Sequence, residues 1–164
     1  SSVLVDGMRF DASIGPRGSS YAMGSETELV RRLLRSGHQA WHVRDAVVEH
    51  FIRREQMDKA WVLNRAIRFG RGQYRLAMTD GGRTRVKTWW GTPRHLIRQL
   101  AQEYVAILAA ASSGDARRLF RARWDLNYVR GAIIEARSAL DSMRAESREG
   151  SNDSTSARHQ GRPD

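Results

Sequence analysis

The sequence predicts an α/β chain that is mainly α-helical, with about four helices and two or three short strands near residues 39–51. In four separate segments apolar residues recur at intervals of three and four, the spacing that places them on one face of a helix. Two short apolar runs separated by charged residues lie between the first and second of these segments, as is typical of strands joined by a turn. The length of 164 residues is sufficient for one domain with a core.

The first predicted helix begins at Ser25. Ser25 and Glu28 have the S-x-x-E spacing of a capping box, in which both side chains bond backbone N–H groups at the helix start. Residues 29–34 supply an apolar stripe, and Gly37 follows where a glycine commonly ends a helix.

Residues 39–51 are predicted to be extended. Residues 40–43, apolar except for His42, and residues 46–48 suit short extended pieces, and Arg44-Asp45 between them suits a turn. His50 follows the second run. Ligands and catalytic groups collect at strand ends in α/β folds, although a partly exposed histidine is a common alternative.

Three more helices are predicted, at about residues 56–78, 93–112 and 115–144. Thr92 and Pro93 have the residue types of N-cap and first helical position, and Asp115 that of an N-cap. A basic stripe on the 56–78 helix consists of arginines at steps of three and four, namely Arg65, Arg68, Arg71 and Arg75. Residues 145–164 offer little to bury, so this tail is predicted to be disordered.

The formal net charge of +10 comes almost entirely from arginine. A strongly basic chain is typical of proteins that bind a polyanion such as nucleic acid or an anionic membrane. A GC-rich genome would enrich arginine and alanine equally well without creating a binding surface, so charge alone leaves both interpretations open. The absence of cysteine excludes disulfides and thiolate metal sites.

The acidic residues Glu26 and Glu28 at the start of the first helix also allow two interpretations. The helix dipole favours acidic side chains in a first turn, so both can be purely structural. The same field favours the ionised carboxylate, so Glu26 could accept a proton as a general base.

The order of motifs over residues 1–52 resembles the C-terminal part of the catalytic domain in family-2 glycosyltransferases of the GT-A fold. In that family a G-G-F-D-E loop precedes a G-E-D-x-D/E-L-x-x-R-L helix, and a glycine turn, a strand and a segment ending in V-x-H follow. The matching stretches here are Phe10-Asp11, residues 24–29 with Arg32-Leu33, Gly37-His38 and residues 46–50.

The resemblance implies roles for individual residues. The family's general base corresponds to Glu26, where this chain has Glu for the usual Asp, and Ser25 replaces the usual Glu. The closing histidine corresponds to His50 and implies a ligand for the divalent metal, Mn²⁺ or Mg²⁺, that holds the donor diphosphate. Arg65 and Arg68 could bind the same phosphates, with a solvated helix face as the alternative.

The resemblance further implies an enzyme that transfers sugar, with inversion, from a nucleotide-sugar donor to a carbohydrate or lipid-linked acceptor of the cell-envelope polysaccharide type. We expect it in the cytoplasm, with peripheral contact to the inner face of the membrane and no nucleic-acid partner. The family binds nucleotide on an N-terminal βαβ half with a D-x-D motif, and this chain contains no Asp-x-Asp. We therefore expect residues 1–52 to be the C-terminal part of a catalytic domain, residues 53–144 a helical extension, and the chain to be inactive alone. An open apolar face is expected near Ala46, Val48 and residues 29–34.

A rival interpretation is a small arginine-rich helical module that binds nucleic acid or an anionic membrane surface. It would use the basic stripe, arginines of the last helix and Trp89-Trp90 as an interfacial anchor. It accounts for the charge but not for the motifs of residues 1–52. A third interpretation combines the two, as a transferase whose helical part docks on the membrane to reach a lipid-linked acceptor.

Overall fold

The computed structural model describes residues 7–16, 18, 21–79 and 87–159. Its elements are α2 (Ser25–Arg35), the 3-10 helix η1 (Arg54–Met57), α3 (Lys59–Thr79), β1 (Thr88–Trp89), β2 (Thr92–Pro93), α4 (Arg94–Ser112) and α5 (Ala116–His159). This described part is mainly helical, with four α-helices and one small antiparallel sheet, which confirms the predicted fold class. None of its helices has the length and apolar character needed to cross a membrane.

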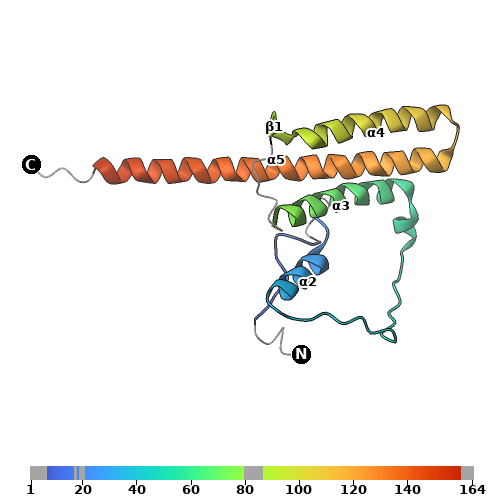
Figure 1. Ribbon diagram of the computed structural model, residues 1–164, viewed down its shortest axis with the longest axis horizontal. Coiled ribbons are helices and arrows are strands. Elements are labelled where there is room, and N and C mark those ends of the chain that lie inside the picture. Colours follow the sequence, from blue (N-terminus) through green and yellow to red (C-terminus); the bar gives the residue numbers. More distant parts are fainter. Residues whose placement is uncertain (1–6, 17, 19–20, 80–86, 160–164) are drawn as a thin grey trace, which may run out of the picture.

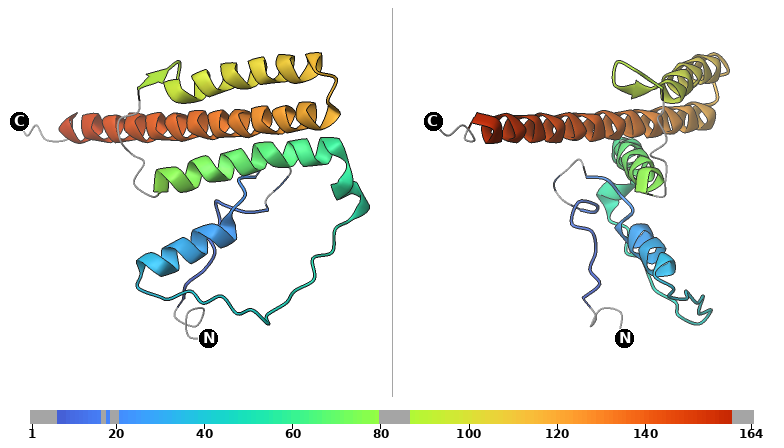
Figure 2. Two further views of the ribbon diagram at one scale, coloured as in Figure 1. Left: turned by 45° about the vertical axis from the view of Figure 1, so that its right-hand side comes forward. Right: turned by 60° about the vertical axis from the view of Figure 1, so that its left-hand side comes forward.

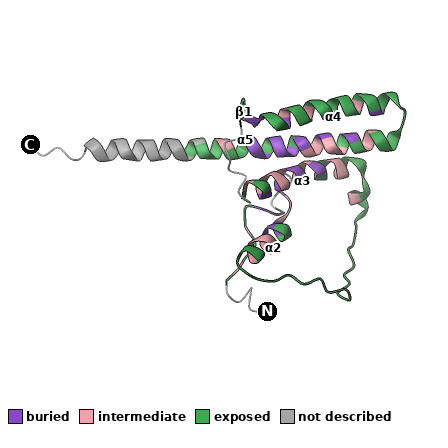
Figure 3. Cartoon of the chain, viewed as in Figure 1, coloured by how far each residue is buried: buried purple, intermediate pink, exposed green. Residues whose placement is uncertain are grey.

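Helix α5 is the central element. Helices α3 and α4 pack along it on different sides, and α2 lies beyond α3 (Figure 1 and Figure 2). Figure 3 shows that the buried residues of α5 lie in the stretch flanked by both neighbours. The core consists of Leu96 from α4 and the α5 residues Val129, Ala132, Ile133 and Ala136.

Helices α3 and α5 touch backbone to backbone at two glycines. A Cβ atom on Gly70 would lie 2.0 Å from the carbonyl oxygen of Tyr128, and a Cβ atom on Gly131 would lie 2.0 Å from that of Ile67. Each helix therefore places a carbonyl group in the space that the other leaves open by having glycine. Only glycine fits at either position without moving the helices apart.

A buried carboxylate joins the same two helices. Glu135 on α5 is 3% exposed and accepts hydrogen bonds from Arg71 Nε at 3.0 Å and Arg75 Nε at 2.6 Å. Arg75 also donates to the carbonyl oxygen of Ser13. The predicted basic stripe is therefore only in part a solvent-exposed face, because two of its four arginines are engaged inside the fold while Arg65 is exposed.

We expect Glu135→Gln to lower the free energy of unfolding by about 2–3 kcal/mol, because the amide leaves two half-buried guanidinium groups without their counter-charge. Urea denaturation followed by circular dichroism measures this change. Glu55→Gln is the matched control, since the exposed Arg53–Glu55 pair at 4.0 Å should contribute less than about 1 kcal/mol. Equal midpoints for the two variants would contradict a stabilising role for Glu135.

The prediction of strands near residues 39–51 is wrong. Residues 38–53 have no regular structure except the predicted turn at Arg44-Asp45, and their backbone bonds include the local Ala46 N–H to Val43 O at 3.2 Å. A strand needs a neighbouring strand to pair its backbone groups, and the described residues offer none beside this segment. Its apolar residues are accordingly exposed, with Val48 at 88%.

The sheet lies elsewhere, in a hairpin before α4. Trp89 pairs with Thr92, and the two-residue turn has positive φ at both Trp90 (48°) and Gly91 (74°), as in a type I′ turn. Thr92 and Pro93 are therefore strand residues, with Pro93 at the N-cap of α4, rather than the predicted N-cap and first helical residue. The chain has to turn back through the hairpin before the helix can begin.

The predicted starts of α3 and α5 agree more closely. Asp115 Oδ1 accepts the backbone N–H groups of Arg117 and Arg118, which confirms the N-cap of α5. Helix α3 begins at Lys59 rather than Gln56, because Asp58 Oδ1 accepts the N–H of Ala60. Helix α5 continues to His159, where a disordered tail was expected from residue 145, and residues 160–164 lie outside the described residues.

Candidate functional site

The residues that lead into helix α2 contact the backbone of α3. The Met23 N–H donates to the carbonyl oxygen of Arg68 at 3.1 Å, and a Cβ atom on Gly72 would lie 1.6 Å from the carbonyl oxygen of Met23. Gly24 then provides the N-cap with φ 114°, a conformation that favours glycine. These contacts fix the first turn of α2, where both candidate carboxylates lie.

The capping-box prediction for Ser25 is wrong, because the cap is Gly24 and Ser25 lies inside the helix. The Ser25 hydroxyl donates instead to Glu26 Oε2 at 3.2 Å. The end of α2 is as predicted: the N–H of Gly37, at φ 86°, bonds Leu34 O and the N–H of His38 bonds Leu33 O.

The two glutamates of the first turn differ in their surroundings. Glu28 is 7% exposed and accepts two hydrogen bonds from Arg32, at 2.9 and 3.0 Å. Arg32 also donates to the carbonyl oxygen of Arg9 at 2.6 Å, which ties α2 to the N-terminal loop. Glu26 is exposed. Glu28 is thus a structural residue, and Glu26 is the carboxylate that faces solvent.

Asp11 organises the loop next to this helix. Its carboxylate accepts the Ser13 N–H at 2.8 Å. That backbone hydrogen bond is the main cause that lowers the pKa of Asp11, and the charges of Arg75 and Arg32 lower it further. Asp11 of the Phe10-Asp11 motif therefore stabilises a loop whose carbonyl groups accept hydrogen bonds from both arginines.

Arg65 and Arg68 lie together over aromatic rings. The Arg68 guanidinium is 5.1 Å from the ring centre of Tyr21 and 5.5 Å from that of Trp61, and Arg65 is 5.6 Å from Trp61. Arg68 Nε is buried and has no hydrogen-bond partner among the described residues. A buried donor of this kind is uncommon in a folded protein and suits an anionic ligand.

His50 is exposed and lies in the irregular segment between α2 and η1. Neither Glu26 nor His50 lines any of the four cavities described for this chain. Within the described residues no three His, Cys, Asp or Glu side chains are grouped so that they could hold a metal ion. His50 alone therefore does not make a metal site.

The structure thus unites some of the predicted residues and separates others. Arg65 and Arg68 share Trp61, and the carbonyl group of Arg68 bonds Met23, three residues before Glu26. His50 lies neither with the arginines on Trp61 nor at the start of α2. Tyr21 and Trp61 were missed by sequence reasoning, although the spacing of Trp61, Arg65 and Arg68 at i, i+4 and i+7 places them on one helix face.

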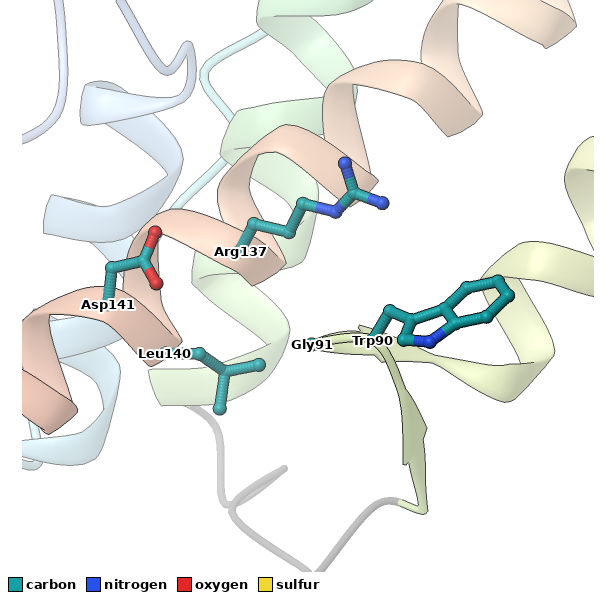
Figure 4. Close-up of a pocket in the computed structure, with 5 residues that line it drawn as sticks. All are labelled: Trp90, Gly91, Arg137, Leu140 and Asp141. Carbon is teal, nitrogen blue, oxygen red and sulfur yellow. The ribbon is translucent and has the colours of Figure 1, made fainter.

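The hairpin before α4 borders three cavities. One of about 410 Å³ lies between the two tryptophans, α4 and α5, and another of about 450 Å³ lies beside Trp89 on α4. The third, of about 350 Å³, lies between the Trp90-Gly91 turn and α5, with the Leu140 side chain towards the turn (Figure 4). Comparison of the chain with models of known protein families, with curated proteins and with solved structures gave no significant match.

Proposed function

We propose that the chain forms the acceptor-side part of a glycosyltransferase that moves a sugar from a nucleotide-sugar donor to an acceptor hydroxyl, with inversion. Glu26 would take the proton of the acceptor hydroxyl as its oxygen attacks the anomeric carbon. The observation that carries the proposal is the contrast between Glu28, which is buried and paired with Arg32, and Glu26, which is exposed in the same helical turn. That the reaction is sugar transfer is inferred from the order of motifs over residues 1–52, which resembles that of family-2 glycosyltransferases.

The exposed apolar segment supports the same proposal. Trp41, Val47 and Phe51 are each more than four-fifths exposed, and Val30 and Leu34 of α2 are about half exposed. Apolar surface of this extent is typical of a region that another structural unit covers. In the proposed enzyme this exposed apolar segment would pack against a nucleotide-binding half supplied by polypeptide outside these residues.

Arg65 and Arg68 would bind the donor phosphates. The arginine side chains are held by stacking on Trp61, and Arg68 Nε has a hydrogen atom available for a ligand oxygen. A divalent ion, Mn²⁺ or Mg²⁺, would neutralise the charge on the departing diphosphate. His50 would supply one of its ligands, and the others would come from the donor and from outside the described residues.

We expect His50→Ala to weaken metal-dependent donor binding at least about tenfold, because a metal ligand is lost. Calorimetric titration of the complete enzyme with nucleotide-sugar, with and without Mn²⁺, measures this effect. His42→Ala is the matched control, since it removes another exposed histidine from the same segment. Unchanged metal dependence in His50→Ala would remove His50 from the site.

The test of the catalytic proposal is turnover by Glu26→Gln relative to Glu28→Gln in the complete enzyme, with a large loss expected only for the first. The arginine-rich module is less well supported, because Glu135 engages Arg71 and Arg75. The enzyme would lie in the cytoplasm at the inner face of the membrane, with a carbohydrate or lipid-linked acceptor.

A further inference from the structure

Apolar residues on the α4 side of the molecule form a surface that we call the hairpin patch, made of the exposed Trp89, Trp90, Ala101 and Ile134 and the half-buried Ile97. Trp89 and Ile97 line both of the larger cavities, so the two hollows adjoin. The apolar surface continues along α4 through Val105 and Leu108, which lie four and seven residues after Ala101 and are mostly exposed. This spacing is that of one helix face.

The tip of the patch is an exposed tryptophan in a constrained turn. Trp90 is 83% exposed and stacks on Trp89 with ring centres 5.1 Å apart and planes 8° from parallel. Its φ of 48° is unfavourable for a side chain of this size, and type I′ turns favour asparagine there. The fold thus holds a large amphipathic ring outward at a position where it contributes little to the core.

The charges around the patch are basic. Arg94 and Arg98 line the cavity on α4, and Arg130 and Arg137 line the cavity between α4 and α5. Neither cavity is lined by an acidic residue, whereas Asp141 borders the third cavity beside Leu140 (Figure 4). The only acidic residue of α4, Glu103, is half-buried near Asp125 on α5. Burial raises the pKa of Glu103, and the charge of Asp125 raises it further.

We infer that the hairpin patch binds the surface of an anionic lipid bilayer. Tryptophan rings concentrate at the membrane–water interface, and a helix with an apolar face and basic flanks lies in the plane of that interface. Arg94, Arg98 and Arg130 are exposed and form no ion pair within the described part of the chain, so all three can meet lipid phosphates. The net charge of +10 favours the same partner.

The experiment is flotation of the full chain with vesicles of phosphatidylglycerol and phosphatidylcholine in equal parts, and with phosphatidylcholine alone. Binding is expected to the anionic vesicles and to weaken with added salt. Trp90→Asn removes the ring but suits the turn, and should weaken binding about tenfold. Joint Arg94→Gln and Arg98→Gln changes should weaken it about 25-fold, at about a fivefold loss for each arginine.

Joint Arg44→Gln and Arg54→Gln changes are the matched control. They remove the same charge from the exposed segment between α2 and α3, on the far side of the molecule from α4 (Figure 1). Equal losses in this control would overturn the inference, since bulk charge would then explain the binding. No flotation of the unaltered chain would overturn it too, as would a concentration-dependent dimer that Trp90→Asn abolishes without any vesicle binding. None of these measurements depends on sugar transfer, so they separate this inference from the proposed activity.

Discussion

Replacing Glu26 with glutamine is expected to lower turnover of the complete enzyme about 10²- to 10⁴-fold, the usual contribution of general acid–base catalysis. Glutamine keeps the size of the side chain and can still accept the Ser25 hydrogen bond, but it cannot take a proton from the acceptor. The contacts that seat α2 on α3 involve Met23 and Gly72 rather than Glu26, so the fold should be retained. Donor affinity should barely change, and calorimetry with nucleotide-sugar measures it beside steady-state turnover.

Glu28→Gln is the matched control for this experiment. The same chemical change two residues away disturbs the pair with Arg32, so it should lower stability slightly and leave the turnover of folded protein nearly intact. A fully active Glu26→Gln enzyme would end the proposed mechanism. Similar losses in both variants would instead indicate that the first turn of α2 has only a structural role.

Gly131→Ala is expected to lower the free energy of unfolding by about 4 kcal/mol or more. The new methyl group would lie 2.0 Å from the carbonyl oxygen of Ile67, in the backbone of α3, which no side-chain rotation can relieve. Relief requires the helices to separate, and the neighbouring contacts, Asn127 Nδ2 to Leu63 O at 3.3 Å and the Phe69–Tyr128 ring pair, would loosen with them. Urea denaturation followed by circular dichroism measures the change.

The expected loss of stability is opposite to the effect of intrinsic helix propensity, which favours alanine over glycine by about 1 kcal/mol. Asn64→Ala on the exposed side of α3 is the control, and should change stability by less than about 0.5 kcal/mol. A Gly131→Ala variant that is as stable as the unaltered chain, or more stable, would show that α3 and α5 do not approach this closely.

The helices were predictable because each depends on local spacing. The apolar stripes of α2, α3, α4 and α5 and the terminal residues Gly37 and Asp115 act within a few positions of the chain, so periodicity and capping rules identify them. The prediction of strands at residues 39–51 failed for the converse reason. Alternating apolar residues make a strand only if another strand pairs with them, and such a partner is not a local property.

The candidate site was predictable only in part. The acidic pair at the start of α2 was visible, but the division of roles between Glu26 and Glu28 follows from Arg32 reaching both Glu28 and Arg9. The engagement of Arg71 and Arg75 likewise depends on Glu135, sixty or more positions away. The hairpin was missed because Trp90 adopts a conformation that its residue type disfavours, so turn rules gave no signal there.

The way α2 is attached to α3 has a mechanical consequence for Glu26. The contact through Met23 and Gly72 acts as a pivot at one end of the helix, while the last residues of α2 are exposed and lie about 15 Å further along its axis. A rocking motion of about 10° would carry Arg35 through about 3 Å but displace the backbone of Glu26 by less than about 1 Å. The Glu26 carboxylate would therefore keep its position relative to α3 while the far end of α2 moves.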